Sequence, residues 1–399
     1  MSQFSPSPFS VEDISQPSVP RVLIAPHRYI QGEGILDHLG RYLSIISSKR
    51  AAIFISEGGQ RRLGKRILQS LKQAQVQSIV EIFRGECSTE EVDRAAAVLR
   101  SEEAPIDCLI AVGGGKCLDA GKCVAFRLSV PVVICPTIAS TDAPCSALSV
   151  MYTPEGVFNR VEFFPNSPNI VAIDTRIIVE APLRYLVAGM GDALATWYEA
   201  RTCFRNSEAR STVGAHLTIA ALTIAELCAK TVFEYGLAAA AAVRQAEVND
   251  AFERVVEANT LLSGVGFESG GLAAAHAVAS GLTVLPTLQQ HLLHGEKVAI
   301  GLLTQLVLED DLDEAKRVAV FLAKVGLPVH LGHLGLDLEA DGEALMAVID
   351  ATMASPIIHN EPFEVTPEKI LTAFSQVHQL GLEVTASIGD DAYRDLQGG

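Results

Sequence analysis

The sequence predicts an α/β layer followed by an all-helical region: an open parallel sheet of the Rossmann-like kind, then a helical bundle. Two observations support this prediction. Short apolar runs alternate with helical patterns up to about Asp174, and such alternation is typical of a parallel sheet with helices on both faces. After Pro182 the strand patterns stop, and helical periodicity continues almost to the end of the chain.

Six apolar runs are the expected strands of the first region. In chain order they are RVLIAP, AAIFIS, QSIVEIF, DCLIAVGGG, VPVVICPT and NIVAID. The helical patterns between them include GILDHLGRYLSII, RLGKRILQSLKQ and TEEVDRAAAVLRS. In the second region, breaks at glycine and proline predict about seven to nine helices. We therefore expect a flexible tail over residues 1–20, an α/β domain over 21–178 and a helical domain over 179–399.

Charge and composition argue against several classes of partner. Of the 399 residues, 31 are basic and 47 are acidic, and the net charge of −16 repels nucleic acid and anionic membrane surfaces. The amino terminus has no basic region and no continuous apolar run, so we expect no signal peptide. Apolar stretches elsewhere are too short to span a bilayer. The eight cysteines include no C-x-x-C pair and are expected to be reduced core thiols of a cytoplasmic protein.

Three polar residues in otherwise small, apolar runs are candidate metal ligands. They are Asp192 in VAGMGDALATWYEA, His276 in SGGLAAAHAVASGL and His294 in HLLHGEKVAIGLL. A buried imidazole needs a partner, since an unpaired buried polar group costs about 1–3 kcal/mol. One carboxylate and two imidazoles suit a divalent metal and leave a coordination position open. The alternatives are a core histidine bonded to a carbonyl, and His291 in place of His294, one helical turn away.

A glycine turn between a strand and a helix is a candidate phosphate-binding loop. The strand CLIAVGG runs into Gly114, Gly115 and Lys116, and a helical pattern follows. Backbone N–H groups and the helix dipole in this arrangement can receive a pyrophosphate. The G-x-G-x-x-G fingerprint fails, because it would need glycine at Leu118. A simple tight turn is therefore the alternative to nucleotide binding.

The strand that follows ends in the long polar segment PTIASTDAPCSALSVMYTPEG. Loops at the carboxyl ends of parallel strands are where ligands bind in open α/β sheets. A surface loop built from Asx and Ser turns is the alternative. The hydrogen-bonding side chains are more numerous than a turn needs: Thr137, Ser140, Thr141, Asp142, Ser146 and Tyr152.

Taken together and in order, these motifs resemble the glycerol dehydrogenase group of the iron-containing (group III, metal-dependent) alcohol dehydrogenase family. The resemblance covers roughly Val22 to Phe374. It rests on GGGK with Asp119, PTIASTDAPCSALSVMY, AGMGDALATWYEA, GGLAAAHAVASGL, HLLHGEK and IHNEPFEVTP. It implies a dehydroquinate synthase-like fold, in which a nucleotide-binding α/β domain precedes a helical metal-binding domain and the active site lies in the cleft.

The resemblance also implies roles for individual residues. The implied metal ligands are Asp192, His276 and His294, with His291 as a neighbour, and Asp142 is implied to contact a substrate hydroxyl. The implied contacts of the cofactor's phosphate and amide groups are Gly114, Gly115, Lys116 and Asp119. The residues implied to line the rest of its site are Thr137, Ser140, Ser146, Leu148 and Tyr152.

Two departures from the family pattern bear on cofactor and metal. Ser56 or Glu57 stands where the family has an aspartate that accepts the adenosine ribose hydroxyls, so NAD is expected while NADP stays open, with Arg61 and Arg62 nearby. Thr196 stands where the iron-dependent branch has a third histidine. We therefore expect a three-ligand Zn²⁺ site, with Fe²⁺ as the alternative.

The expected reaction is reversible oxidation of a polyol, glycerol or a related vicinal diol, to a hydroxyketone such as dihydroxyacetone, with hydride transfer to NAD. The metal would act as a Lewis acid on the hydroxyl. Alternatives are a dehydrogenase of phosphorylated glycerol, a carbocyclic synthase resembling dehydroquinate synthase, and a nucleotide-binding protein without turnover. ALATWYEA lacks the lysine that such synthases place there, and no phosphate pocket is evident. The resemblance further suggests a homo-oligomer, an octamer or a dimer.

Overall fold

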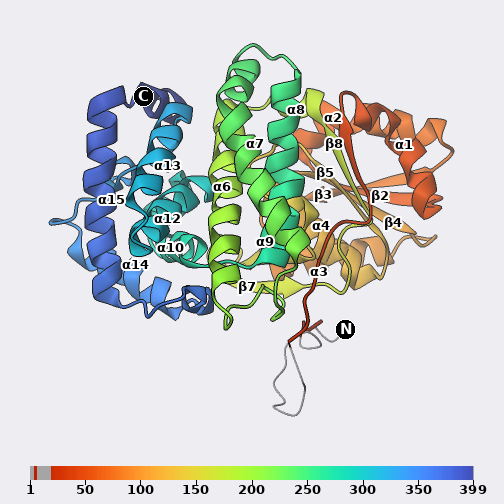
Figure 1. The fold of residues 1–399 in the computed structure, drawn as a ribbon. Helices are drawn as coiled ribbons and strands as arrows, with labels where there is room; N and C mark the ends of the chain where they lie inside the picture. The colour runs from red at the N-terminus through yellow and green to blue at the C-terminus, as the bar shows by residue number, and fades with distance from the viewer. Residues whose placement is uncertain (1–3, 7–18, 399) are drawn as a thin grey trace. The chain divides into compact units, whose positions relative to one another are not determined.

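The computed structural model describes residues 4–6 and 19–398, which divide into two compact units (Figure 1). Unit 1 contains residues 4–6 and 24–181, and unit 2 contains residues 19–23 and 182–398. The sequence predicts the division slightly earlier, between residues 178 and 179. Apart from residues 4–6, 19 and 20, the expected tail lies outside the described residues.

A six-stranded, entirely parallel sheet forms the centre of unit 1, as the sequence predicts. From one edge to the other its strands are β1 (Tyr29–Gly32), β8 (Ile170–Asp174), β5 (Val132–Pro136), β4 (Cys108–Gly113), β2 (Arg50–Ser56) and β3 (Gln77–Phe83).

The direction of winding reverses between β2 and β4. Ala51 of β2 pairs with Ser78 of β3 on one side and with Cys108 of β4 on the other. The chain thus moves outward from β2 to β3 and then returns to add β4, β5 and β8 on the opposite side of β2. Ligands of open α/β sheets bind outside the strand ends at such a reversal. Here those ends are Ser56 and Gly113.

Helices cover both faces of this sheet, and β2 shows why. Its alternate residues Ile53 and Ile55 lie in a core cluster with residues of α2 (Glu57–Gln73). Its other side chains, such as Phe54, lie in a second cluster with α3 (Thr89–Arg100) and α4 (Gly115–Leu128). Because side chains alternate across a strand, burial on both faces explains a continuous apolar run such as AAIFIS.

Two sequence predictions for the expected α/β domain are wrong. The run RVLIAP is not a sheet strand: Arg21 forms only an isolated bridge with His216, and β1 begins three residues after Pro26, which has no N–H to donate. The segment GILDHLGRYLSII is not one helix. It forms the 3₁₀ turns Ile35–His38 and Leu43–Ile46 on either side of the short helix α1 (Leu39–Tyr42).

The polar segment after β5 contains a hairpin, although the sequence predicts a loop there. Strands β6 (Leu148–Tyr152) and β7 (Phe158–Phe163) pair antiparallel in a separate two-stranded sheet. Gly156 makes the turn between them with a φ of 84°, a conformation that glycine adopts without steric cost. The alternating pattern of LSVMY was the available signal for β6.

Unit 2 is helical, as predicted, but its described residues form eleven α-helices rather than seven to nine. These are α6 (Leu183–Arg205), α7 (Ile219–Arg244), α8 (Asp250–Glu257), α9 (Ser263–Gly270), α10 (Ala274–Leu282), α11 (Pro286–His291), α12 (His294–Leu308), α13 (Leu312–Val325), α14 (Gly342–Ala354), α15 (Pro367–Ile388) and α16 (Asp391–Gln397). The excess comes from short segments: α11 and α16 are brief, and a π-helical turn, Ala258–Leu262, separates α8 from α9. In this unit α6 packs against α7 and α9, and α10 packs against α12 and α14 (Figure 1).

The described residues agree with two expectations from composition. All eight cysteines are buried and free. Within residues 4–6 and 19–398, no helix combines the length and the apolar character that crossing a bilayer needs.

Candidate functional site

The three candidate metal ligands converge in unit 2. Asp192 comes from the middle of α6, His276 from the first turn of α10, and His294 is the first residue of α12. One ligand atom from each residue lies within 4.8 Å of the others. The Asp192 Oδ1 atom is 3.3 Å from His276 Nε2 and 3.4 Å from His294 Nε2. The fold therefore gathers three residues from distant parts of the chain into one cluster.

These distances suit a shared cation. Ligand atoms about 2.0–2.1 Å from a tetrahedral Zn²⁺ lie roughly 3.3–3.4 Å apart. The side chain of Asp192 is 1% exposed and that of His276 is 11% exposed, whereas that of His294 is 44% exposed. The cluster is closed on the Asp192 side and open at His294. The donor atoms present, one carboxylate oxygen and two imidazole nitrogens, fit a divalent cation with an accessible coordination position.

The electrostatics of the cluster favour positive charge. Burial raises the pKa of Asp192, but attraction to His294 and hydrogen bonding with His276 outweigh it and hold the pKa below its ordinary value. Burial lowers the pKa of His276, but the charge of Glu199 and the contact with Asp192 raise it well above the ordinary value. Two buried carboxylates thus face one imidazole, and a cation between the ligands would balance them.

Glu199 is a site residue that was not predicted from the sequence. Its side chain is fully buried. Its Oε2 lies 2.5 Å from His276 Nδ1, while its Oε1 accepts the backbone N–H of His276 at 2.9 Å and of Ala273 at 2.7 Å. Glu199 lies about two helical turns after Asp192, so both carboxylates are on one face of α6. That spacing of two acids in an apolar helix was the available signal.

Glycines beside Asp192 and His294 allow the helices to approach closely. A methyl group at Gly295, next to His294, would lie 1.7 Å from the carbonyl oxygen of Ala188 in α6. A methyl group at Gly191, next to Asp192, would lie 2.6 Å from the carbonyl oxygen of Gly295. Only glycine at these two positions lets α6 and α12 come near enough for the short Asp192 side chain to meet His294.

A partly buried ion pair positions the start of α12. The guanidinium of Arg184 binds the Glu296 carboxylate through two hydrogen bonds of 2.6 and 2.7 Å. Glu296 Oε2 also accepts the backbone N–H of Leu293, and Arg184 donates to the carbonyl oxygen of His291. His291 is exposed and is not a member of the cluster. The carbonyl oxygen of His291, and not its ring, contributes here, because its hydrogen bond with Arg184 helps to fix the segment that carries His294.

Thr196 occupies the position one turn after Asp192. Its hydroxyl lies 2.8 Å from that of Ser263, and the side chain is fully buried. A methyl group at Gly266 would lie 2.5 Å from the Thr196 methyl carbon. Thr196 thus packs against α9, and the cluster among the described residues has three members.

The glycine loop of unit 1 lies at the point where the sheet reverses its winding. Strand β4 ends at Gly113, Gly114 is the N-cap of α4, and Gly115 is its first residue. The next residue, Lys116, places its ammonium 2.6 Å from Glu86 Oε2 and 5.2 Å from the centre of the Tyr152 ring. Burial raises the pKa of Tyr152. The loop has the strand–turn–helix geometry that receives phosphate groups.

Lys122 is a second residue that was not predicted from the sequence. Its ammonium is buried and lies 2.9 Å from Asp119 Oδ1, 3.1 Å from Ser146 Oγ and 2.5 Å from the carbonyl oxygen of Leu148. Asp119 Oδ2 also accepts the N–H of Val150. Three expected cofactor residues, Asp119, Ser146 and Leu148, therefore surround one buried cation. A lysine in an apolar helix pattern, CLDAGKCVAF, was the available signal.

The remaining expected residues of unit 1 lie at the ends of β2 and β5 or in the segment that follows β5. Ser56 caps α2, its hydroxyl accepting the N–H of Gly59 at 3.1 Å, and Glu57 is exposed, 3.7 Å from Arg61. The N–H of Thr137 donates to the carbonyl oxygen of Gly113, which ties the end of β5 to the glycine loop. The polar residues that follow are nearly buried: Ser140 and Asp142, each 9% exposed.

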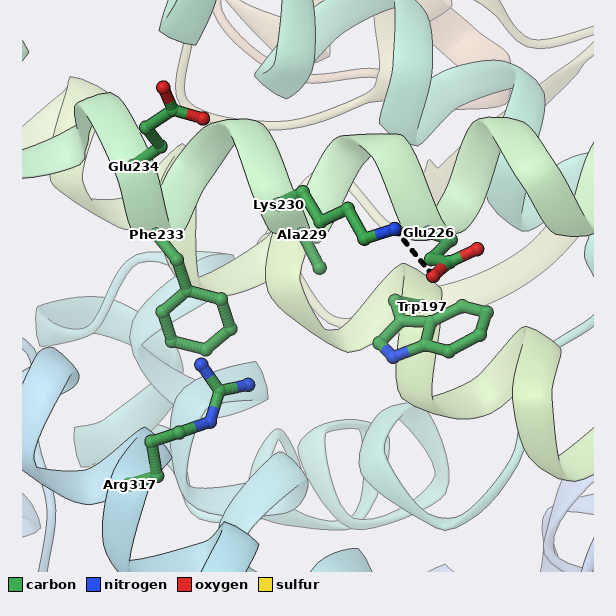
Figure 2. Close-up of a pocket in the computed structure, with 7 residues that line it drawn as sticks. All are labelled: Trp197, Glu226, Ala229, Lys230, Phe233, Glu234 and Arg317. Atoms are coloured by element: carbon green, nitrogen blue, oxygen red, sulfur yellow. Dashed lines mark ion pairs between the residues drawn. The ribbon is translucent and has the colours of Figure 1, made fainter.

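A separate surface hollow in unit 2 contains none of the expected site residues (Figure 2). Its volume is about 540 Å³, and it is lined by Trp197, Glu226, Ala229, Lys230, Phe233, Glu234 and Arg317. Charged groups in it already have partners: Lys230 is 2.7 Å from Glu226, and the Arg317 guanidinium lies over the Phe233 ring. The candidate metal cluster is thus distinct from this hollow.

Comparison with known proteins agrees with the resemblance found in the motifs. The family described as iron-containing alcohol dehydrogenase matches residues 26–175. A glycerol dehydrogenase from Thermotoga maritima is 45% identical over 90% of this chain and 97% of its own length. One from Escherichia coli O6:H1 is 46% identical over 90% and 97%. The crystal structure of glycerol dehydrogenase from Schizosaccharomyces pombe superposes with a TM-score of 0.87 and 38% identity, covering 93% of this chain and 94% of that one. The chain therefore belongs to the iron-containing alcohol dehydrogenase family and, within it, to the glycerol dehydrogenase group.

Proposed function

We propose that this enzyme reversibly oxidises glycerol or a related vicinal diol to the hydroxyketone and transfers the hydride to NAD. Asp192, His276 and His294 would hold the divalent cation that the reaction needs. The observation that carries this proposal is the convergence of their three ligand atoms within 4.8 Å, in a chain 45% identical to a glycerol dehydrogenase. The same identity favours a dehydrogenase over a carbocyclic synthase.

The residues of the cluster would bind the cation and leave one side of it open to the substrate. A bound divalent cation supplies a Lewis acid that lowers the pKa of a substrate hydroxyl. The carboxylate of Asp192 stays ionised because its pKa is held below the ordinary value, so it offers a charged oxygen at neutral pH. The partly exposed side of His294 would be the approach for the diol, since the Asp192 side is buried.

We propose zinc as the cation, with iron as the alternative. The donor set has two imidazoles and one carboxylate, which is a common catalytic zinc arrangement. Thr196 occupies the place of a fourth protein ligand with a side chain that is packed against Ser263. Metal analysis of protein purified without added metal distinguishes the two.

We propose that NAD binds along the strand ends of unit 1. The N–H groups of Gly114, Gly115 and Lys116 would receive the pyrophosphate at the start of α4. Ser56 or Glu57, at the end of the neighbouring strand, would meet the adenosine ribose. The proposed lining of the rest of the site comprises Asp119, Thr137, Ser140, Ser146, Leu148 and Tyr152. NADP stays the alternative, since Arg61 and Arg62 are close in sequence to Ser56.

Asp142 is the proposed contact for the second substrate hydroxyl. It lies at the start of the 3₁₀ turn Ala143–Cys145, and the carbonyl oxygen of Ala143 is bound by Lys122 at 3.0 Å. A carboxylate there would accept a hydrogen bond from a neighbouring hydroxyl and so favour a diol over a simple alcohol.

The experiment that tests the proposal follows absorbance of the reduced nicotinamide. Metal-loaded and chelator-treated enzyme is mixed with glycerol or 1,2-propanediol, and with NAD or NADP. Metal-dependent reduction of NAD with a diol is the expected result. An enzyme that holds metal and nucleotide but reduces neither cofactor with any diol would contradict it, and glycerol phosphate would then be the next substrate. A homo-oligomer, octamer or dimer, is a further proposal that light scattering tests.

A further inference from the structure

The amino terminus of α10, which carries His276, is capped entirely by side chains from other segments. The first four N–H groups of a helix have no partner within it. In α10 all four donate to buried side chains: Ala273 and His276 to Glu199, Ala274 to Glu361, and Ala275 to Gln305. Of these three acceptors, Glu199 is the one that also contacts the His276 ring, at 2.5 Å.

We propose that Glu199 is a positioning residue that fixes the tautomer and orientation of His276, so that the Nε2 lone pair points toward Asp192 and His294. This role rests on the proposed metal ligation by Asp192, His276 and His294. It concerns the second carboxylate of α6, whose function the ligand set alone does not explain.

The tautomer follows from the number of donors and acceptors around the ring. A neutral imidazole carries one N–H and one lone pair. Both oxygens of an ionised Glu199 can only accept, and Oε1 already receives two backbone N–H groups. The ring proton must therefore lie on Nδ1, facing Oε2, which leaves Nε2 unprotonated on the ligand side. Carboxylates that bind the outer nitrogen of a ligating histidine orient the ring and raise its basicity.

Glutamine at position 199 would have the same shape but could not satisfy both contacts. If its amide oxygen accepts the backbone N–H groups of Ala273 and His276, its NH₂ group faces Nδ1 and moves the ring proton to Nε2. If the amide is reversed, its NH₂ group opposes two backbone donors, which leaves buried donors unpaired. Either arrangement weakens cation binding.

Glu361 offers a matched control at the same helix end. It is also buried, and its Oε1 accepts the N–H of Ala274 at 3.1 Å. Among the described residues, its Oε2 has no hydrogen-bond partner. An amide can therefore replace this carboxyl without disturbing an acceptor. The His276 ring instead bonds to Glu199, so the control changes the helix cap and leaves the ring contact in place.

The test compares the Co²⁺ affinity of Glu199→Gln with that of Glu361→Gln. Both variants are made in the full chain and measured without nucleotide. Apoprotein is titrated with Co²⁺, followed by visible absorption of the bound ion and by quenching of Trp197, the only tryptophan. We expect Glu199→Gln to bind Co²⁺ about 10–100-fold more weakly than wild type. Glu361→Gln should bind it as wild type does. Thermal unfolding of both apoproteins establishes that they are folded.

Four outcomes would be decisive. Equal affinity of Glu199→Gln and wild type overturns the inference, and so does an equal loss in both variants, which would assign the effect to helix capping. Failure of the wild type itself to bind Co²⁺ would instead contradict the proposed ligand set. If Glu199→Gln does not fold, Glu199→Asp keeps two acceptor oxygens and should bind more weakly than wild type, with the absorption spectrum of the same coordination. An unchanged affinity in folded Glu199→Asp would contradict the inference.

Discussion

Asp192 and Glu199, two turns apart on α6, contact opposite nitrogens of a single imidazole. Asp192 Oδ1 lies 3.3 Å from His276 Nε2, and Glu199 Oε2 lies 2.5 Å from His276 Nδ1. One helix therefore supplies both a candidate ligand and the carboxylate that orients the ring of another. Because both carboxylates are buried on one helix, their contacts define a single orientation of the His276 ring.

Gly295→Ala should separate the two helices that carry Asp192 and His294. The added methyl group would lie 1.7 Å from the carbonyl oxygen of Ala188, so the backbone must move. We expect a stability loss of at least about 1–3 kcal/mol and weaker Co²⁺ binding, measured by thermal unfolding and metal titration. Gly342→Ala is the control, since its methyl group meets nothing within 4 Å. Wild-type Co²⁺ affinity in Gly295→Ala would show that this helix crossing does not position the ligands.

Lys122→Met should disturb unit 1 and leave the metal cluster intact. The change leaves Asp119 buried without its cation and removes the donor to Ser146 and Leu148. Breaking a buried ion pair in this way costs about 3–5 kcal/mol. We expect a lower Tm and weaker NAD binding by calorimetry, with Co²⁺ affinity unchanged. The double variant Lys122→Met, Asp119→Leu should regain part of the lost stability, and no recovery would argue against the ion pair as the cause.

Glu361 should make stability fall as pH rises. Burial and then the charge of Glu309 raise the pKa of Glu361 from 4.5 to about 8. The folded chain therefore keeps a proton that the unfolded chain releases above its own pKa, so the free energy of unfolding decreases between about pH 4.5 and pH 8. A pKa that differs by one between the folded and the unfolded chain corresponds to about 1.4 kcal/mol, so the total decrease is several kcal/mol.

Glu361→Gln tests this pH dependence, because the amide does not titrate. The Tm of the variant relative to wild type should increase from about pH 5 to pH 9 as the wild type loses stability. Thermal unfolding of both proteins across this range is the measurement. A Tm difference that is constant with pH would contradict the raised pKa of Glu361.

Asp142→Ala should reduce activity on diols much more than on monoalcohols. Loss of a hydrogen bond to a charged group corresponds to about a 10–100-fold loss in kcat/KM. The measurement compares kcat/KM for 1,2-propanediol and 1-propanol in the variant and the wild type. An equal loss on both substrates would mean that Asp142 has no part in recognising the second hydroxyl.

The buried strands of unit 1 could be predicted because burial on both faces leaves a direct trace in the sequence. AAIFIS and NIVAID are apolar runs of strand length, and they form the buried strands β2 and β8. Strand β1 has no continuous apolar run in its sequence, because its residues YIQG are only partly buried at the sheet edge. The prediction for the first helical segment of unit 1 also failed, because apolar periodicity does not distinguish 3₁₀ turns from a continuous helix.

The residues of the candidate metal cluster could be predicted because ligand chemistry restricts the residue types. Histidine and aspartate are rare in alanine-rich helices, so Asp192, His276 and His294 stand out. The side chains of Glu199 and Lys122 contact other expected site residues. A single charged residue in a helix is usually on a solvated face, so the sequence did not single them out. The close helix crossing at Gly295 depends on the distance to another helix, which sequence spacing does not reveal.

Anomalous diffraction at the zinc absorption edge, from crystals of zinc-loaded protein, would locate the cation without any assumption about its ligands. We predict one strong peak within about 2.0–2.2 Å of Asp192 Oδ1, His276 Nε2 and His294 Nε2. Glu199 should remain bonded to His276 Nδ1 in the same crystals. A fully occupied zinc peak elsewhere, with no peak at this cluster, would contradict the proposed ligand set.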